Sequence, residues 1–419
     1  MTTAHQNPAR AALDRVVRAE FGLIVAGLTR RFGDLDLAED MAQEAVAEAL
    51  QRWPDEGVPR NPAAWLTLTA RNRAIDRLRR ESSRQSRHRE AYDMLPPPED
   101  VDPSDVVTAS ELTDDRLRLI FTCCHPALAQ ESQVALTLRL LGGLTVAEIA
   151  SAFLVEERAL AQRITRAKKK IAAARIPYRV PEDHDLPERL EAVLTVVWLV
   201  FNEGYLPQAE ASERVDLVDE AVRLARVLGQ LMPDEPEVWG LLATLLLTRA
   251  RSAARLIDGR LVPLQDQDRS RWDAAMVAEG HALVRRCLQA NRPGPHQFLA
   301  AVNAVHTDAA TAADTDWDQV VALYDQWLAV APTPVVELNR AVAIGERDGA
   351  AAGLAIIDEL DLARYHAWHV ARAEMLQRLG RKSEAVQAFR AGLGLATIPA
   401  ERAHLGLRLA ELGSLPPEA

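Results

Sequence analysis

Hydrophobic residues recur at the three- and four-residue spacing of helices along nearly the whole chain, and strand-like alternation is scarce. A first helix is predicted from Ala11 to Phe32. A second is predicted over residues 35–50, where small apolar residues face inward. The polar residues expected on its outer side are Glu39, Asp40, Gln43, Glu44 and Glu48. The predicted fold class is therefore all-α.

A loop and a third helix follow. Residues 51–60 contain Trp53, two prolines and a glycine, and are predicted to form the loop. Asn61 is predicted to cap the third helix, with Pro62 at its first position, where a missing N–H has no cost. One side is expected to bury Leu68, Ile75 and Leu78. Another side carries a stripe of arginines at steps of four, three and four, namely Arg73, Arg77, Arg80 and Arg84.

An acidic, proline-rich stretch separates this part from the next helices. Residues 85–110 are predicted to be an extended, mobile linker because their proline and acidic residues do not suit a packed helix. Helices are expected to resume near Glu111. Thr145 and Glu148 form a capping-box pattern that opens a short helix. The pattern predicts a domain over residues 111–180.

The helix after this short one has the properties of a recognition helix in a helix-turn-helix. Its predicted apolar face consists of Leu160, Ile164, Ala167 and Ile171. The cationic and polar residues available for nucleic acid are Arg158, Gln162, Arg163, Arg166, Lys168, Lys169 and Lys170. Apolar residues dock such a helix on its own domain, while long cations reach phosphates and base edges in the major groove.

Charge divides the chain into two halves. Of 49 Lys and Arg against 60 Asp and Glu, residues 1–180 hold 26 and 25, which leaves 23 against 35 in residues 181–419. Nucleic-acid contact is therefore expected in the N-terminal half, because the acidic half would repel a polyanion. Three cysteines are too few for a disulfide framework, and no signal segment or membrane-length apolar run is found, so a cytoplasmic setting without membrane contact is predicted.

The N-terminal 175 residues resemble extracytoplasmic-function (ECF) sigma factors of the sigma-70 family, with regions two and four. Three motifs in order carry the resemblance: the run from Leu35 to Glu44, the segment containing Trp65-Leu66 and Arg77-Leu78-Arg79-Arg80, and the run from Gly142 to Ile171. The resemblance implies a helical region two over residues 1–84 and a helix-turn-helix region four over residues 111–180. It implies core RNA polymerase, through its clamp helices and flap, and promoter DNA as partners.

The resemblance also implies roles for the residues named above. The polymerase-binding residues would be Glu39, Asp40, Gln43, Glu44 and Glu48. The −35 element would be read by Arg158, Gln162, Arg163, Arg166, Lys168, Lys169 and Lys170. The −10 element would be bound by Trp53, Asn72, Arg73, Asp76, Arg77, Arg80 and Arg84, with Trp53 as a wall of a base pocket. Considered singly, an arginine stripe is more often a solvated, salt-bridged surface, and Trp53 and Trp65 are more often core residues.

The remaining residues, 181–419, exceed what such a sigma factor needs and are predicted to be a tetratricopeptide-like helical regulatory domain. Two sets of residues repeat 32 positions apart, from Ala341 to Leu360 and from Ala373 to Gly392. Stacked helix pairs of this kind form a concave surface for peptide or protein binding. A protein partner for this domain is therefore expected, and the extension is expected to regulate activity, docking on the basic helices or on polymerase.

Three further patterns favour structural roles. Phe201 to Tyr205 is predicted to be a helix end with Gly204 as its terminator, and the alternative is a ligand site at Glu203. The arginines 249, 251 and 255 are predicted to form a salt-bridged seam, with a helix cap at Asp268 or Ser270; the alternative is a groove for an anion. Cys123, Cys124 and His125 lack the spacing of a metal site, so a packed helix is preferred. No catalytic residue, metal or cofactor is predicted.

Two rival functions stay open. A stand-alone helix-turn-helix regulator with a tetratricopeptide sensor would bind duplex DNA without polymerase, but it would not need the acidic segment Asp40 to Glu48. An enzyme with its active site in the C-terminal half is the other rival. We find no glycine-rich phosphate loop, nucleophile elbow or paired-carboxylate motif in the sequence to support it.

Overall fold

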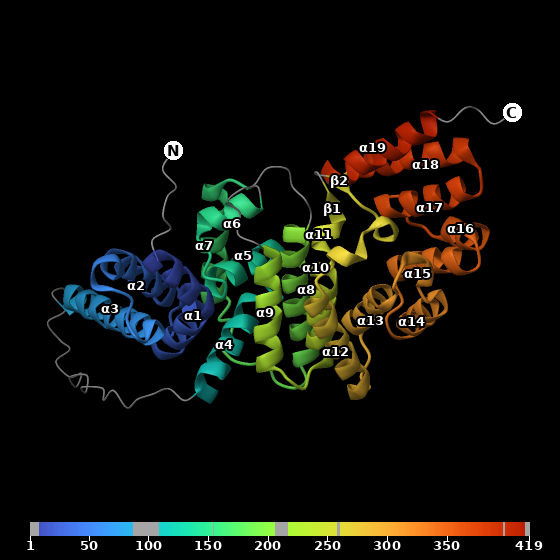
Figure 1. Ribbon diagram of the computed structural model, residues 1–419. Coiled ribbons are helices and arrows are strands. Elements are labelled where there is room, and N and C mark those ends of the chain that lie inside the picture. The colour runs from blue at the N-terminus through green and yellow to red at the C-terminus, as the bar shows by residue number, and fades with distance from the viewer. Residues whose placement is uncertain are drawn as a thin grey trace. The chain divides into compact units, whose positions relative to one another are not determined.

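The computed structural model describes residues 8–86, 109–153, 155–205, 217–257, 260–396 and 399–414 (Figure 1). These residues are almost entirely helical, which confirms the all-α prediction. The chain forms two compact units, Met1–Leu199 and Val200–Ala419, and each is described by itself. Most of the predicted linker, residues 87–108, lies outside the described residues.

The first unit contains seven complete helices among its described residues and most of an eighth. They are α1 (Pro8–Phe32), α2 (Leu35–Glu56), α3 (Pro62–Ser86), α4 (Ala109–Cys123), α5 (Gln130–Leu140), α6 (Val146–Ala152), α7 (Glu157–Ala173) and α8 (Leu186–Tyr205), whose last residues belong to the second unit. Helices α1, α2 and α3 pack on one another as a bundle, and α4 and α5 both contact α1. The helix-turn-helix consists of α6 and α7, with α5 packed on α7.

Helix α2 is longer than predicted, and the loop expected over residues 51–60 is wrong in its first half. The helix continues through Pro54 to Glu56 and is capped by Gly57, whose φ is +84°. Two interactions offset the cost of the internal proline. Trp53 is 2% exposed and packs edge-on against Trp65, with ring centroids 5.6 Å apart. Arg52 pairs with glutamates one turn before and after it on α2.

Helix α3 begins as predicted but buries a different face. The Asn61 side chain accepts a hydrogen bond from the Ala64 N–H at 3.1 Å, which confirms the cap. The buried residues are Leu66, Ala70 and Ala74, each fully inaccessible, whereas Leu68 is 55% and Leu78 is 40% exposed. The small alanines allow α3 to lie close to its neighbours. The predicted face was wrong because it was chosen from the large apolar residues of the helix.

The helix-turn-helix follows the predicted pattern closely. The Thr145 N–H donates to Glu148 Oε2 at 2.7 Å, and the Glu148 N–H donates to Thr145 Oγ1 at 3.1 Å, so the capping box is confirmed. Helix α7 buries Leu160, Ile164, Ala167 and Ile171, as predicted. The predicted structural role of Cys123 and Cys124 is also confirmed, because both side chains are buried at the end of α4.

The second unit begins with the end of α8 and continues with shorter helices. They are α9 (Leu217–Leu231), α10 (Pro236–Arg249), α11 (Ser252–Arg255), α12 (Ala274–Ala290), α13 (Pro295–Asp308), α14 (Trp317–Val330), α15 (Pro334–Arg347), α16 (Ala350–Glu359), α17 (His366–Arg378), α18 (Lys382–Leu395) and α19 (Pro399–Ser414). Helix α10 is buried along most of its length between α9, α12 and α13. A two-residue antiparallel pair, β1 (Leu256–Ile257) and β2 (Arg260–Leu261), and three 3-10 turns, η1 (Leu264–Asp266), η2 (Arg269–Arg271) and η3 (Ala312–Asp314), complete the described part of the unit.

Helices α14 to α19 pack in chain order, each against the next, as Figure 1 shows. The two predicted repeats coincide with the pairs α15–α16 and α17–α18. Their small residues are buried where the paired helices cross: a Cβ built on Gly353 of α16 would lie 2.7 Å from the Ala341 carbonyl oxygen of α15. Phe389 of α18 is fully buried in the core of the second pair.

Candidate nucleic-acid interface

The arginines of α3 and the acidic residues of α2 pair with one another along the seam between the two helices. Arg73 contacts Glu44 at 2.9 Å and Glu48 at 2.7 Å, and Arg77 contacts Asp40 at 3.0 Å. The hydrogen bond from Arg73 lowers the pKa of Glu48. The two sets of residues that we assigned to different partners are therefore adjacent, and each reduces the net charge of the other. Gln43, beside them on α2, is half-buried.

Other predicted residues of α3 point to solvent. Asn72, Asp76 and Arg80 are exposed, and Arg80 Nε donates to the Asp76 carbonyl oxygen at 3.1 Å. The side chain of Arg84 lies outside the described residues. Trp53 is not a pocket wall in this structure, because its ring is buried in the bundle beneath Trp65. The partly exposed tryptophan of this region is Trp65, with the Arg52 guanidinium 5.8 Å from its ring.

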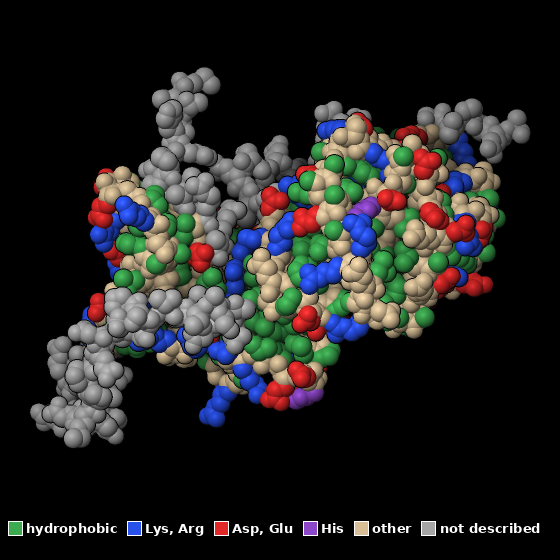
Figure 2. Space-filling model, turned by 60° about the horizontal axis from the view of Figure 1, so that its bottom comes forward, with side chains coloured by type: hydrophobic (Ala, Val, Ile, Leu, Met, Phe, Trp, Pro, Cys, Tyr) green, Lys and Arg blue, Asp and Glu red, His purple; other side chains and the backbone are tan. Residues whose placement is uncertain are grey.

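Helix α7 presents most of its predicted DNA-binding residues on the surface. Arg158, Gln162, Arg166, Lys169 and Lys170 are exposed, and Arg163 is half-buried. These side chains emerge opposite the apolar face that packs on α5 and α6. On the molecular face shown in Figure 2, by contrast, Lys and Arg are interspersed with Asp and Glu. After Glu157, α7 contains no acidic residue, so its exposed side chains give it a cationic surface.

Lys168 and Glu39 depart from the prediction, because both side chains are withdrawn from solvent. Lys168 Nζ lies 2.6 Å from Glu39 Oε2 and 2.6 Å from Asp36 Oδ1, and Arg139 Nε lies 2.5 Å from Glu39 Oε1. Lys168 retains 11% of its side-chain exposure and Glu39 retains 6%. Glu39 was predicted to lie on the outer side of α2 and Lys168 to face DNA. We call Asp36, Glu39, Arg139 and Lys168 the inter-helix ion cluster.

The electrostatic balance keeps Lys168 protonated. Burial would lower the pKa of Lys168, but the carboxylates of Glu39 and Asp36 outweigh it, and the pKa lies above its usual value. Arg139 also donates to the Leu144 carbonyl oxygen at 2.9 Å, which fixes its guanidinium. Sequence reasoning missed Arg139, because a lone arginine on the mostly buried helix α5 carries no signal of a partner a hundred residues away.

A second set of contacts, also missed, joins α1 and α4 to Tyr178 in the segment after α7. Tyr178 Oη donates to the carbonyl oxygens of Ala26 on α1, at 2.9 Å, and Asp115 on α4, at 3.1 Å. The buried Asp115 carboxylate pairs with Arg30 at 2.8 Å and with Arg118 at 2.9 Å. Burial is the first cause, and Asp115 the second, that raises the pKa of Tyr178 well above its usual value. The phenol therefore stays a donor at physiological pH.

In the second unit, the predicted seam of arginines is only partly salt-bridged. Arg249 pairs with Asp219 at 3.1 Å, but Arg251 donates to the Asn303 amide oxygen at 3.2 Å. Arg255 donates to the Tyr205 carbonyl oxygen and lies 3.9 Å from its ring centroid. The predicted cap is confirmed, since Asp268 accepts from the Ser270 N–H at 3.0 Å.

The predicted helix end at Gly204 is only approximately right. Helix α8 runs one residue further, to Tyr205, and Gly204 does not adopt a left-handed conformation there. A Cβ built on Gly204 would instead lie 2.7 Å from the Leu217 Cβ at the start of α9. The glycine is therefore required by close packing between two helices.

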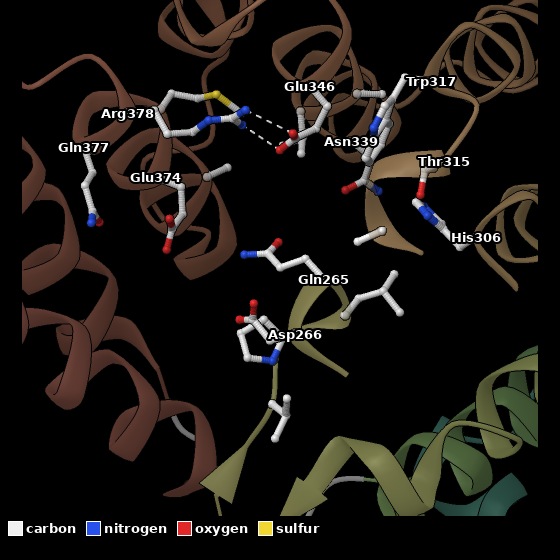
Figure 3. Close-up of a pocket in the computed structure, with 18 of the residues that line it drawn as sticks. Gln265, Asp266, His306, Thr315, Trp317, Asn339, Glu346, Glu374, Gln377 and Arg378 are labelled. Atoms are coloured by element: carbon white, nitrogen blue, oxygen red, sulfur yellow. Dashed lines mark hydrogen bonds and ion pairs between the residues drawn. The ribbon is translucent and has the colours of Figure 1, made fainter. Parts of the chain in front are cut away.

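A groove of about 1520 Å³ lies on the inner side of helices α15, α17 and α19 and is bordered by residues 261–266. Figure 3 shows Glu346 and Arg378 paired across its wall, with the contact at 2.6 Å, and Asn339 and Gln265 directed into the space. Arg408 pairs with Glu374 at 3.0 Å on the same wall. The volume exceeds the range of roughly 300–1,000 Å³ typical of small-molecule pockets, so the groove suits a polypeptide better than a metabolite.

Within the described ranges, no three His, Cys, Asp or Glu side chains come together in a way that could hold a metal ion. The described helices likewise include none with the length and apolar character needed to span a membrane. Burial raises the pKa of Cys124 to about 12 and that of Cys287 to about 11, so neither thiol is activated as a nucleophile.

Comparison with known proteins identifies three matching families. Residues 16–84 match the family described as Sigma-70 region 2, and residues 118–171 match Sigma-70, region 4. These ranges contain the α2–α3 seam and most of helix α7. Residues 189–288, which include α9, α10 and most of α12, match a family of unknown function, DUF6596.

Individual relatives match either most of the chain or a smaller part of it. The chain is 44% identical over 404 residues to "Uncharacterized protein R00370" of Rhizobium meliloti, covering 94% of each chain. It is 29% identical over 176 residues to "Probable ECF RNA polymerase sigma factor SigI" of Mycobacterium tuberculosis, covering 41% of this chain and 59% of that protein. It is 33% identical over 130 residues to "ECF RNA polymerase sigma factor SigK" of Mycobacterium ulcerans, covering 30% of this chain and 65% of that protein.

Proposed function

The chain belongs to the ECF group of the sigma-70 family and carries a C-terminal extension, and on this basis we propose that it binds core RNA polymerase and directs initiation at specific promoters. The observation that supports this most directly is the surface of α7. Arg158, Arg166, Lys169 and Lys170 are exposed on a helix whose opposite face is docked by Leu160 and its neighbours. Such a helix can enter the major groove while its domain stays outside.

In this proposal α7 reads the −35 element. Arg163 and Arg166 are the candidates for base contacts, because a guanidinium can donate two parallel hydrogen bonds to a guanine edge. Lys169 and Lys170 contact phosphates, which position the helix without reading sequence. Lys168 is excluded from this role while it is held in the inter-helix ion cluster.

Region 2 supplies the remaining contacts. The exposed residues of α3, with Asn72 and Arg80 foremost, follow the strand at the −10 element, and the acidic surface of α2 binds the clamp helices. An unstacked base requires an aromatic or apolar platform. Because Trp53 is buried, we assign this platform to Trp65, which is the partly exposed partner of the tryptophan pair.

The extension governs activity in this proposal. Its groove has walls fixed by ion pairs between neighbouring helices, and a preorganised surface binds a partner at a lower entropic cost. We propose a segment of a protein partner as the occupant. Replacing Asn339 by Trp places a large ring in the groove and is expected to change activity, whereas Gln387→Trp, on the exposed side of α18, is the matched control.

In-vitro transcription with purified core polymerase tests the proposal. The full chain is combined with a library of promoter fragments, and initiation at a defined subset is expected. The variant R163A/R166A is expected to lose about 1–3 kcal/mol per base contact, whereas Arg390→Ala, an exposed arginine of α18, should leave initiation unchanged. Unaltered promoter use by R163A/R166A would contradict the role of α7. Duplex binding without any polymerase-dependent initiation would favour a stand-alone regulator.

A further inference from the structure

Three arginines of the second unit lie close together on α11, η2 and the residue before α11. Arg251 donates to the Asn303 amide oxygen at 3.2 Å, and Arg269 donates to the His306 carbonyl oxygen at 2.6 Å. These acceptors are one turn apart on α13, so the two guanidiniums are neighbours. Arg255 ends α11, which contacts η2. We call Arg251, Arg255 and Arg269 the arginine triad, and none of the three forms an ion pair with a described carboxylate.

The charge of the arginine triad is not compensated by the described residues. The Arg251 Nε is buried and has no hydrogen-bond partner among them. Burial, and then the charges of Arg255 and Arg269, lower the pKa of Arg251, and Tyr205 opposes this effect. A guanidinium nevertheless stays protonated in proteins, so the unit holds a partly buried cluster of like charges. Such a cluster destabilises the fold unless an anion accompanies it.

This lack of ion pairs contrasts with the surplus of acidic residues in the extension, where 35 Asp and Glu accompany 23 Lys and Arg over residues 181–419. Elsewhere in the unit Arg340 pairs with Asp325 at 2.6 Å. The charge of Asp314 does act on Arg269. Its carboxylate, however, accepts from the Thr311 N–H at 3.0 Å and from the Thr311 hydroxyl at 2.7 Å. Pairing within the protein therefore does not explain the arginine triad.

The arginine triad borders the groove of the extension through Arg269. Arg269 and His306 both line this groove, and Figure 3 shows His306 on its wall. Arg269 donates through Nη1 to the carbonyl oxygens of His306 and Ala309, at 2.6 and 2.7 Å. Arg255 donates through Nη1 to the Tyr205 carbonyl oxygen at 2.8 Å. A guanidinium has five N–H donors, so both arginines retain donors for the oxygens of a ligand.

We infer that the arginine triad binds a phosphate monoester that enters from the groove. A guanidinium presents two parallel N–H donors that match the geometry of phosphate oxygens. A monoester carries close to two negative charges at neutral pH, so it offsets three cations better than a single carboxylate does. The phosphate belongs to a free metabolite or to a phosphorylated side chain of the protein segment that we propose for the groove. The second source rests on the proposed function.

Titration of the full chain with inorganic phosphate tests the site. Isothermal titration calorimetry in a chloride buffer, at constant ionic strength, should show saturable binding at one site. Acetate has a single charge and should bind about tenfold more weakly or worse, because it offsets less of the charge of the arginine triad. Absence of saturable phosphate binding, or equal affinity for acetate and phosphate, would overturn the inference.

Substitutions within the arginine triad locate the binding. Arg251→Gln and Arg269→Gln should each lower the affinity for phosphate about tenfold or more, because each removes a charge-assisted hydrogen bond. Arg340→Gln, which breaks the ion pair with Asp325 in the same unit, is the matched control and should bind phosphate like the wild type. Wild-type affinity in both triad variants would overturn the inference.

Thermal unfolding separates a ligand site from a structural role of Arg251. Without phosphate, Arg251→Gln should unfold at the same temperature as the wild type or a higher one, because an uncompensated charge is removed. With phosphate, the wild type should gain stability and the variant should not. If Arg251→Gln were destabilised equally with and without phosphate, Arg251 would be structural and the site would be refuted. Arg269→Gln gives the binding result even if Arg251→Gln does not fold.

Two further probes identify the source of the phosphate. Adenosine monophosphate represents a free metabolite, and a phosphoserine tripeptide represents a phosphorylated partner. The probe that binds more tightly than inorganic phosphate supports its own source. Equal binding of the tripeptide with and without its phosphate would contradict phosphate recognition. These measurements use no polymerase, so failure of promoter-specific initiation would contradict the proposed function and leave the arginine triad as a binding site.

Discussion

Arg73 of α3 contacts Glu48 of α2 at 2.7 Å, and this ion pair joins two helices that we assign to different partners. The guanidinium is about two-fifths exposed and the carboxylate about one-fifth, so solvent screens the pair. Surface pairs contribute at most about 1 kcal/mol to the free energy of unfolding. The pair therefore restrains the orientation of Arg73 more than it stabilises the bundle.

We accordingly expect Arg73→Ala to lower the free energy of unfolding by less than about 1 kcal/mol, and to weaken binding to a −10 single strand much more clearly. Urea unfolding and strand binding by fluorescence anisotropy measure the two effects. Arg226→Ala, which removes a surface ion pair with Glu279 in the second unit, is the control. Equal strand binding by the two variants would remove Arg73 from the interface.

Trp53 is expected to act through the core. Replacing this buried ring by Ala leaves a cavity, and we expect a loss of about 3–5 kcal/mol in the free energy of unfolding, with Trp53→Phe losing much less. Denaturant unfolding of both variants provides the measurement. A stable Trp53→Ala variant that fails only in promoter melting would instead support the base-pocket role predicted from the sequence.

Two glycines of the extension should respond in opposite directions to the same change. Gly353→Ala places a Cβ 2.7 Å from a backbone oxygen of α15, so we expect a loss of roughly 1–3 kcal/mol. Gly394 of α18 has open space around it and no left-handed φ, so Gly394→Ala should stabilise by about 0.5–1 kcal/mol. Thermal unfolding of the full chain compares them, and a stabilising Gly353→Ala would refute the close crossing.

His306 should make the second unit sensitive to acid. Burial, and then the charges of Arg251 and Arg269, lower the pKa of His306 to about 4 from 6.5. The unfolded chain therefore binds more protons than the folded one between these values, and stability falls as pH falls through this range. Between pH 7 and pH 5 this difference in pKa lowers the free energy of unfolding by about 2 kcal/mol. His306→Gln should remove this pH-dependent loss, and unfolding curves of both proteins at pH 7 and pH 5 test it. An equal loss of stability in the variant and the wild type would contradict the assignment to His306.

The elements that could be predicted from sequence are those governed by local patterns. Helix α7 follows from four apolar residues at helical spacing, and the start of the preceding helix α6 follows from its capping box. The extent of α2 could not be predicted, because the packing of Trp53 on Trp65 outweighs the signal of Pro54. The face of α3 was misjudged because Ala70 and Ala74, not its leucines, allow the closest approach.

The candidate site was predictable in composition but not in arrangement. Exposed cations on α7 were expected and are present. The pairing of Glu39 with Arg139 and Lys168 joins residues a hundred or more positions apart, and only the packing of two domains brings them together. A charge pattern in one helix contains no information on which distant helix will bury it.

The crossing of α15 and α16 has a consequence for evolution of the extension. A Cβ on Gly353 would lie 2.8 Å from the Gly345 Cα, so the separation of these helices is limited by main-chain atoms. The spacing of α15 and α16 is consequently set by the backbone, whereas the groove that α15 also borders is lined by side chains such as Asn339 and Glu346, whose substitution alters its chemistry. Descendants of this chain can thus acquire new binding preferences by point mutation while the spacing of α15 and α16 is inherited unchanged.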